Sequence, residues 1–416
     1  MRNVKDFGAV GDGKTKDTAA IQKAIDAGGA VYFPPGTYLT GTLFLRSHGG
    51  LQLETGAVLL GSLDPEDYIL EDPGSPSRVV KTEQTSDEHL IVALGLENVF
   101  IRGGRIDGRS ADFYAGQPET LSFGCRKTLA CPPWKPAQML FFHESKNIRI
   151  EDVELVNSPF WHCFLHGCEW VTIRGVHINS SPLEHNNDGI DIDCCSHVTV
   201  SDCIIDVGDD ALTLRGNPKH LTAKRSCEYV TVSNCVLRSD YAHAIRIGVG
   251  GGEIRHCAFS NIVMNNTRGA IWICSKYSNR SRGVDISDLA FDHIHAEAMN
   301  FLFIRHDYKF IEGVPFAGVL KDIRFSRLSG RTQLSFLIEG NGLAELANIT
   351  MSDCRFIAGD PRTLSEPERK FFMIEEIGPL FSIKNAIGVA LDKVRVSYDA
   401  PDAWRDAPAE INCAGD

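Results

Sequence analysis

A short phrase of alternating apolar and polar residues returns along the chain. It reads NIRIEDVEL from Asn147, WVTIRGVHI from Trp170, HVTVSDCII from His197 and YVTVSNCVL from Tyr229, with a further copy from Asn98 and weaker ones from Glu253, Val284, Asp322 and Asn348. Apolar side chains with period two indicate strands that bury one face. The shortest separation between equivalent positions, from Val230 to Gly252, is 22 residues. The pattern therefore predicts a repeat of about 22 residues with variable loops.

A second short apolar segment follows most copies at a similar offset. These segments are GIDI from Gly189, ALTL from Ala211, AIRI from Ala244, AIWI from Ala270 and FLFI from Phe301. Two or three short strands per repeat, stacked coil upon coil, predict an all-β, right-handed parallel β-helix with one continuous core. This architecture favours a single domain over residues 1–416, although the length alone would suggest two or three domains.

The ends of a stacked β-helix are sheet edges that need cover. Residues 1–30 are expected to form an N-terminal cap, because Asp17 or Thr18 can begin a helix with Ile21 and Ile25 on one face, and Gly28 can end it. The cysteines at the repeated position are expected to pack inside the coils as small apolar side chains; they are Cys203, Cys235, Cys257 and Cys354. No spacing typical of zinc ligands occurs, so neither a metal nor a cofactor is predicted.

Composition and charge exclude several classes of partner. The chain of 416 residues has 42 Lys and Arg against 54 Asp and Glu, a formal net charge of −12, which argues against a nucleic-acid partner. No stretch approaches the roughly 18 apolar residues of a membrane-spanning helix, and the first residues lack the apolar core of a signal peptide. A cytoplasmic location with reduced thiols is the expectation, and secretion is the alternative if a leader was trimmed. The oligomeric state is left open.

Acidic residues and a histidine share one column of the predicted coils. When the second strands are aligned on their last residue, the position four places earlier is Asp188, Asp210, His243, Gly269 and Asn300 in successive coils, and Asp209 adjoins Asp210. Scattered acids on a β-helix are usually a solvated face. Here they lie at Asn/Gly turns on one line, which favours an open groove for a polysaccharide. Two acids about 6.5–9.5 Å apart suit inverting glycoside hydrolysis.

These residues resemble the polygalacturonase family of glycoside hydrolases. The matching phrases are NNDGIDID from Asn186, GDDALTL from Gly208 and His243-Ala244, supported by FGAVGDGKTKDTAAIQKAID from Phe7, VYFPPGTY from Val31, GRIDGR from Gly104 and NSPFW from Asn157. The resemblance implies an inverting enzyme that cleaves α-glycosidic bonds in pectin-like poly- or oligosaccharides.

The resemblance also implies roles for the acids. Asp209 would protonate the glycosidic oxygen, Asp188 and Asp210 would activate the water, and His243 would tune the protonation of the acid by hydrogen bonding. Asn186 would fix the first turn and help to orient a substrate subsite; a turn asparagine without ligand contact is the alternative.

The sequence departs from the family where a uronate carboxylate would be held. The usual Arg-x-Lys pair is missing from the corresponding strand, where Trp272 is expected to face outward. Trp272 could stack on a sugar ring, or it could be a rim or core residue without ligand contact. Four cations remain in the region as candidate carboxylate ligands or as solvated surface: Arg215, Arg246, Arg268 and Lys276. Both an acidic and a neutral α-linked sugar stay open.

Two segments interrupt the repeat and could close a groove end. The insertion at residues 110–136 and the stretch at 308–319 would favour exo action on short substrates if they do so, and are plain surface loops otherwise. Two other functions remain possible for this fold. One is a β-helix polysaccharide lyase, which needs a Ca²⁺ site and an Arg or Lys base, and the other is a non-catalytic carbohydrate-binding β-helix.

Overall fold

The computed structural model describes residues 1–72, 87–114, 116, 119–123, 126–278, 282–308, 313–371 and 377–414. The chain divides into two compact units. The first is Met1–Glu119, Thr128–Asp209 and Lys219–Lys224, and the second is Thr120–Lys127, Asp210–Pro218 and Arg225–Asp416. Each unit is a stretch of right-handed parallel β-helix, as the repeat predicts. The expectation of a single domain over the whole chain stays a prediction.

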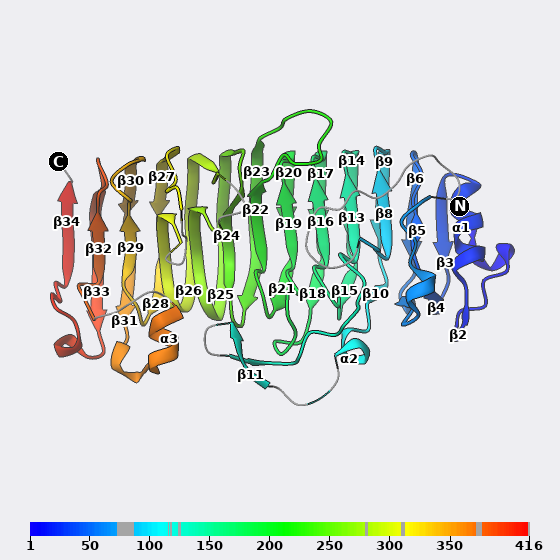
Figure 1. Ribbon diagram of the computed structural model, residues 1–416, viewed down its shortest axis with the longest axis horizontal. Coiled ribbons are helices and arrows are strands. Elements are labelled where there is room, and N and C mark those ends of the chain that lie inside the picture. Colours follow the sequence, from blue (N-terminus) through cyan, green and yellow to red (C-terminus); the bar gives the residue numbers. More distant parts are fainter. Residues whose placement is uncertain are drawn as a thin grey trace. The chain divides into compact units, whose positions relative to one another are not determined.

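The first unit is built from three columns of parallel strands. One column is β1 (Arg2–Asn3), β3 (Ala30–Phe33), β6 (Gly49–Leu53), β9 (Glu97–Arg102), β14 (Lys146–Glu151), β17 (Glu169–Arg174) and β20 (Ser196–Ser201). The second is β2 (Asp12–Lys16), β4 (Gly36–Thr40), β7 (Ala57–Gly61), β10 (Arg105–Asp107), β15 (Glu154–Val156), β18 (His177–Asn179) and β21 (Ile204–Val207). The third is β5 (Leu43–Phe44), β8 (Ile91–Leu94), β13 (Leu140–His143), β16 (Cys163–His166) and β19 (Ile190–Asp193). Figure 1 shows β13, β16 and β19 side by side.

The period-two pattern decides which side chains enter the core. In β17 the buried residues are Val171 and Ile173, and they lie in register with Val198 and Val200 of β20. The intervening residues are partly or fully exposed. Aligned apolar residues in successive coils thus form continuous interior stacks, which is how a strand of six residues obtains a stable core.

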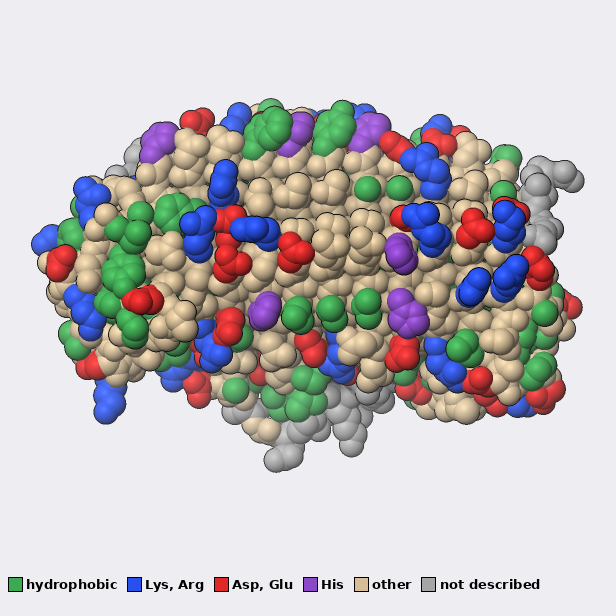
Figure 2. Space-filling view, turned by 180° about the vertical axis from the view of Figure 1, so that it is seen from behind, with side chains coloured by type: hydrophobic (Ala, Val, Ile, Leu, Met, Phe, Trp, Pro, Cys, Tyr) green, Lys and Arg blue, Asp and Glu red, His purple; other side chains and the backbone are tan. Residues whose placement is uncertain are grey.

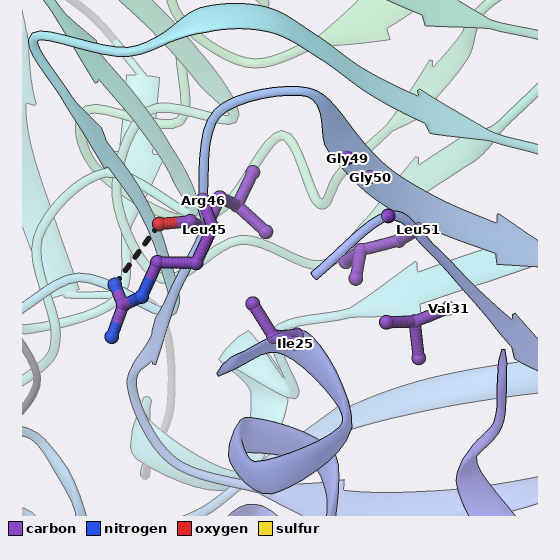
Figure 3. Close-up of a pocket in the computed structure, with 8 residues that line it drawn as sticks. Ile25, Val31, Leu45, Arg46, Gly49, Gly50 and Leu51 are labelled. Carbon is purple, nitrogen blue, oxygen red and sulfur yellow. Dashed lines mark hydrogen bonds between the residues drawn. The ribbon is translucent and has the colours of Figure 1, made fainter. Parts of the chain in front are cut away.

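The N-terminal cap contains the expected helix, α1 (Thr18–Asp26), preceded by η1 (Val4–Phe7). Ile25 of this helix lies near Val31 and Leu51 around a small pocket (Figure 3), and Ile21 is fully buried. Asp17 is the N-cap residue of this helix by position, as predicted. Its carboxylate does not cap the helix but accepts hydrogen bonds from the backbone N–H groups of Val10 and Gly11, at 2.7 and 2.9 Å.

Arg46 joins the end of the cap helix to the neighbouring coils. Its guanidinium pairs with Asp26 in the last turn of α1 at 2.7 Å and with Asp72 at 2.6 Å, and it donates to the carbonyl of Leu45 at 3.0 Å (Figure 3). The side chain of Arg46 is half-buried, so these contacts are partly shielded from water and hold the cap in place.

The second unit has longer strands than the sequence suggests. They are β22 (Leu212–Gly216), β23 (Cys227–Ser239), β24 (His243–Gly250), β25 (Glu253–Lys276), β26 (Asp285–Asp307), β27 (Val319–Ser326), β28 (Ser329–Thr332), β29 (Phe336–Glu339), β30 (Glu345–Ser352), β31 (Arg355–Ala358), β32 (Phe381–Lys384), β33 (Ala390–Tyr398) and β34 (Glu410–Ala414). β25 and β26 each continue around a corner of the coil because left-handed residues such as His256 and Asn261 turn the chain within the paired segment. The final strand, β34, pairs antiparallel with β33 and so covers its edge.

The remaining elements are short. They are η2 (Pro65–Asp67), α2 (Ser110–Phe113), η3 (Pro361–Thr363), α3 (Glu366–Phe371), η4 (Pro401–Ala403) and a separate two-stranded sheet of β11 (Glu119–Phe123) and β12 (Arg126–Thr128). α2, β11 and β12 belong to the predicted insertion, of which residues 115, 117–118 and 124–125 lie outside the described residues; so do 309–312 of the second predicted loop.

The four repeat cysteines are buried as predicted. In each case the thiol lies 3.1 or 3.2 Å from the carbonyl oxygen two residues earlier in the chain, at Ser201, Ser233, Arg255 and Ser352. Burial raises the pKa of Cys257 and of Cys354 to about 12, so these thiols stay protonated and behave as small core side chains.

Among the described residues, no helix is both long enough and apolar enough to cross a lipid bilayer. On the face shown in Figure 2, basic and acidic side chains are interspersed.

Candidate functional site

The first unit contributes Asp188 and Asp209. Asp188 lies just before β19, and its backbone carbonyl accepts hydrogen bonds from the N–H and the ring Nδ1 of His162, both at 2.9 Å. Burial lowers the pKa of His162 to about 4, although its backbone hydrogen bonds oppose the shift. The ring is therefore neutral at neutral pH, with Nδ1–H donating to Asp188 and Nε2 accepting from the N–H of Ser158.

Asn187 ties the turn of Asp188 to the turn of Asp209. Its side-chain oxygen accepts hydrogen bonds from the N–H groups of Gly208 and Asp209, at 3.1 and 2.9 Å, and its amide donates to the carbonyl of Ser181 at 2.6 Å. Asn187 is completely buried. Its side chain thus fixes the backbone at both acids. We call Asn187, Asp188 and Asp209 the first half-site.

Asn186 has a different role from its neighbour. Its φ of 54° lies in the left-handed region, which asparagine tolerates better than most residues. The predicted turn-forming role of Asn186 is therefore consistent with the backbone. A role in a substrate subsite stays a prediction.

The insertion contacts the loop that leads into the first half-site. Leu129 donates its N–H to the carbonyl of Leu183 at 2.7 Å, and the hydroxyl of Thr128 is 2.8 Å from Nε2 of His185. The contacted residues, Leu183 and His185, precede Asp188 by only a few positions in the chain. The insertion is therefore part of the support of the candidate site within the first unit.

Lys135 of the insertion is a buried cation that sequence reasoning missed. Its ammonium donates to the hydroxyl of Tyr114 and to the carbonyls of Pro159 and His185, the last two at 2.6 and 3.2 Å. Burial lowers its pKa to about 8, although Cys131 and three carboxyl groups oppose the shift; these are Glu184, Asp188 and Asp209. The sequence signal was weak, because one lysine among several in a loop does not reveal which one is buried.

The second unit contributes Asp210 and the residues that bind it. Oδ1 of Asp210 is 2.7 Å from Nδ1 of His243 and accepts the His243 backbone N–H at 3.1 Å, and Oδ2 accepts from Arg246 at 2.8 Å. Burial opposes ionisation of this carboxyl, but the Arg246 guanidinium and His243 outweigh it and hold the pKa of Asp210 well below its usual range. We call Asp210, His243 and Arg246 the second half-site.

The imidazole ring of His243 is neutral and buried. Burial lowers its pKa, and the attraction of Asp210 only partly offsets this. Nδ1–H then donates to Asp210, while Nε2 is buried without a hydrogen-bond partner among the described residues. Gly269 is the register neighbour of His243, and a Cβ there would lie 2.7 Å from the ring. A glycine at this position is what leaves room for the imidazole.

The predicted column is confirmed within the second unit. His243 pairs in register with Gly269, and Gly269 pairs with Asn300. The resemblance assigns His243 to the acid Asp209, whereas the hydrogen bond that the structure gives its Nδ1 is to Asp210. Arg246, which the sequence left as a possible surface cation, is the ion-pair partner of Asp210 and also stacks over the ring of Tyr277 at 4.1 Å.

The hypothesis that Trp272 stacks on a sugar is wrong. Its side chain is only 1% exposed, and its ring lies between that of His243, at 4.3 Å, and that of Phe303, at 3.5 Å with the planes parallel to within 3°. The outward parity of this strand was predicted correctly. The face is nevertheless covered, because Trp272 belongs to an apolar cluster that also contains Cys274, Leu334, Leu337 and Leu364.

The other three candidate cations are also buried rather than solvated. Arg268 is 1% exposed and donates to the carbonyl of Tyr241 at 3.0 Å, and the ammonium of Lys276 donates to the carbonyl of Val314. Arg215 is buried at the end of β22.

Comparison with known proteins identifies the family. The model for glycosyl hydrolases family 28 matches residues 73–319, which is more than half of the chain. The chain belongs to this family. A second model, described as rhamnogalacturonase A/epimerase, pectate lyase-like, matches residues 1–66. The family 28 match includes every candidate residue of both half-sites, and it confirms the family predicted from the sequence.

Individual relatives of this family 28 chain are distant. A probable polygalacturonase of Vitis vinifera is 27% identical over 322 residues, covering 66% of this chain and 63% of that protein. The crystal structure of a hyperthermoactive exopolygalacturonase from Thermotoga maritima matches 99% of this chain and 94% of its own, with a TM-score of 0.72 and 21% identity, and so shares the fold. Plasmin and fibronectin-binding protein A of Streptococcus pneumoniae is 41% identical over 117 residues, 26% of this chain and 15% of that protein.

Proposed function

We propose that the protein is an inverting glycoside hydrolase that cleaves α-glycosidic bonds in pectin-like oligosaccharides and acts from chain ends. The observation that carries this proposal is the state of Asp210. Its carboxylate is ion-paired with Arg246, hydrogen-bonded to His243 and held ionised. An ionised carboxylate beside Asp209 in the chain supplies the base that inverting hydrolysis requires.

In the proposed reaction, Asp209 is protonated and gives its proton to the glycosidic oxygen. Asp210, with Asp188, accepts a proton from a water molecule whose oxygen attacks the anomeric carbon on the opposite face of the sugar. The bond from carbon to the leaving oxygen breaks as the bond to water forms, so the anomeric configuration inverts. After one turnover Asp209 has lost a proton and the base has gained one, and exchange with solvent restores both.

The division of labour is supported by the hydrogen bonds of the acids. Asp210 is surrounded by positive and donating groups, which suits a residue that must be charged when water attacks. The neutral ring of His243 orients Asp210 through Nδ1 and presents Nε2 on its other side. His243 is therefore proposed as a positioning residue for the base.

Two observations support action on chain ends. The insertion forms hydrogen bonds with the loop before Asp188 through Thr128, Leu129 and Lys135. In the second unit, Leu364 and its neighbours cover the strand face that carries Trp272 and Phe303. Covered strand faces leave less open groove for a long polymer. The similar protein from Thermotoga maritima carries the name exopolygalacturonase.

The principal test is Asp209→Asn. We expect hydrolysis to fall by about 10³-fold or more, because proton donation to the leaving oxygen is lost, while the thermal unfolding midpoint changes little. The measurement is the release of reducing ends from pectic, rhamnogalacturonan and neutral α-linked oligosaccharides. Full activity of Asp209→Asn on the best of these substrates contradicts the assignment.

The stereochemistry of the first product gives a second test. NMR should show the inverted anomer before mutarotation, and retention would exclude water activation by Asp188 and Asp210. If the wild-type protein binds these oligosaccharides but hydrolyses none of them, the carbohydrate-binding alternative replaces the enzyme. Product with the absorbance of an unsaturated uronide, lost on adding a chelator, would instead identify a lyase.

A further inference from the structure

The insertion brings one buried cation to the loop that leads into Asp188. Lys135 is only 2% exposed, and it lies in the first unit together with Asp188 and Asp209. Burying an ammonium is costly unless its N–H groups and its charge are satisfied by the protein. A loop that only connects two coils has no need to bury a charge. The contacts of Lys135 therefore bear on the site.

The hydrogen bonds of Lys135 match a charged ammonium. Its three N–H groups meet three acceptors, which are the hydroxyl of Tyr114 and the carbonyls of Pro159 and His185, the last two at 2.6 and 3.2 Å. The hydroxyl of Tyr114 in turn donates to the carbonyl of His185 at 3.1 Å. A neutral amine has only two N–H groups, so all three acceptors are used only when Lys135 is protonated.

Two aromatic rings hold the same ammonium. Nζ lies 4.9 Å from the ring centroid of Tyr114 and 5.1 Å from that of Phe160. Phe160 belongs to an apolar cluster that also contains Phe141 and Trp161. The face of an aromatic ring attracts a cation, most strongly where water is excluded. Hydrogen bonds and rings from three separate segments of the chain thus fix the position of this charge.

Titratable groups of the first unit interact with this ammonium. They are Tyr114, Cys131, Glu184, His185, Asp188 and Asp209. Burial lowers the pKa of Lys135 to about 8, and the carboxyls of Asp188 and Asp209 are among the groups that oppose this shift. Burial and the charge of Lys135 together lower the pKa of His185. Because the attraction between two charges is mutual, the same ammonium favours the ionised forms of Asp188 and Asp209.

The two half-sites differ in where they obtain a positive charge. Asp210 has its own cation, because Arg246 pairs with its carboxylate at 2.8 Å. The backbone at Asp188 and Asp209 is held by uncharged side chains, which fix the position of the acids but supply no charge. Lys135 supplies a positive charge in the unit that contains these two acids.

We propose that Lys135 is a positioning residue that sets the pH range of the reaction through Asp188 and Asp209. Its fixed ammonium favours the carboxylate form of both acids. Asp188 is then available as a base, and Asp209 gives up its proton more readily, at a lower pH than without the cation. The proposal rests on the proposed glycoside hydrolase function and gives the insertion a part in catalysis.

The test is the pH dependence of kcat/KM for the wild type, Lys135→Met and Lys135→Arg. All are assayed with the same oligosaccharide, the best substrate of the wild type among the pectic, rhamnogalacturonan and neutral α-linked ones, so that ionisation of the substrate affects every profile alike. Both limbs of the bell-shaped profile should move to higher pH by about 0.5–1 unit in Lys135→Met, because both acids lose a stabilising charge. Lys135→Arg keeps the charge and should keep the limbs near their wild-type positions.

A second neutral variant covers the case in which Lys135→Met does not fold. Lys135→Gln also removes the charge, but its side-chain amide can still donate to the carbonyls of Pro159 and His185. The same shift of both limbs is expected. A purely structural role of Lys135 would lower activity at every pH and leave the limbs where they are.

Tyr114→Phe and Lys146→Met are the matched controls. Tyr114→Phe removes one acceptor of Lys135 but keeps the ammonium and the ring, so it should lower stability and leave the acidic limb in place. Lys146→Met removes a half-exposed positive charge that pairs with Glu169 in the same unit at 3.5 Å. It should leave both limbs in place.

Several outcomes overturn the proposal. They are wild-type limbs in the neutral variants of Lys135, an equal shift in Lys135→Arg, and an equal shift in Lys146→Met. A raised KM without any shift would mean that Lys135 acts on the substrate and not through the acids, and it also overturns the proposal. Hydrolysis of none of the oligosaccharides by the wild type would instead reject the proposed function, on which this proposal rests.

Discussion

The two half-sites hold their acids in different ways. In the first, Asp188 and Asp209 are positioned through the backbone, by the neutral side chains of Asn187 and His162. In the second, Asp210 is held through its carboxylate, by the charged Arg246 and by His243. The first arrangement fixes where an acid lies, whereas the second also fixes its charge. An enzyme that needs one proton donor and one base can use both.

The largest expected difference between the half-sites is in Asp210→Asn. Activity should fall by about 10³-fold, as in Asp209→Asn, because the base is removed. Unlike Asp209→Asn, this variant should also lose about 2–4 kcal/mol of unfolding free energy, because Arg246 is left largely buried without its counter-charge. Urea unfolding of both variants measures the contrast. The exposed Asp353→Asn is the control, and equal stability of the Asp209 and Asp210 variants would break the comparison.

The same contrast has a pH dependence with a definite sign. The pKa of Asp210 is lower in the folded protein than in the unfolded chain, so its stabilisation is fully present above the usual carboxyl pKa of about 4 and is lost as the pH falls further. The stability difference between the wild type and Asp210→Asn should therefore shrink below about pH 4.

Asn187→Ala tests the first half-site and should have the next largest effect. The substitution leaves the N–H groups of Gly208 and Asp209 without their acceptor inside the protein, which costs about 2–4 kcal/mol. Activity should fall by about 10²-fold, because a small displacement of the acids is enough to misalign them. Asn187→Asp restores an acceptor and should recover part of the stability. If the alanine variant is as stable and active as the wild type, Asn187 does not position the acids.

Sequence periodicity predicted the fold because it depends on which side chains face the core. The phrase around Val171 and Ile173 could bury its apolar residues only as a strand in a stacked coil, and the thiol of Cys257 could fit the same interior position. The column of His243, Gly269 and Asn300 followed from the same counting. These features are local and repeat, so each copy supports the others.

The sequence did not predict which residues cover an outward strand face, or which residue a polar side chain binds. Parity placed Trp272 outside the coil correctly, but the residues that bury it, such as Leu364, come from nearly 100 positions later in the chain. From the sequence alone Arg246 could have been a surface cation, and only the structure shows its ion pair with Asp210. Asn186 and Asn187 look alike in sequence, and only the hydrogen bonds from Gly208 and Asp209 distinguish their roles.

Lys135 is an exception in the comparison of the two half-sites, because it is a buried charge in the unit whose acids are otherwise held by neutral groups. Its pKa is lowered to about 8, below the value of about 10.4 in an unfolded chain. Between these pH values the unfolded state binds more protons, so the unfolding free energy gains a contribution that rises with pH, up to about 3 kcal/mol. In Lys135→Met this contribution is absent.

The measurement is the difference in unfolding free energy between the wild type and Lys135→Met, taken at pH 7.5 and again at pH 10. The wild type should gain relative to the variant as the pH rises. Lys146→Met, which removes a lysine whose side chain is 45% exposed, is the control variant. Identical pH dependence in the wild type and Lys135→Met would mean that Lys135 is not desolvated.

The smallest effect is expected for Asn186→Gly, and it separates backbone shape from side-chain contact. Asn186 has a φ of 54°, a conformation that glycine adopts without strain and that a β-branched residue does not. Asn186→Gly should therefore keep stability within about 0.5 kcal/mol, whereas Asn186→Val should lose about 1–2 kcal/mol. If Asn186 acts only through its turn, the glycine variant also keeps its KM. A raised KM with an unchanged free energy of unfolding would instead assign the amide of Asn186 to a substrate subsite next to the first half-site.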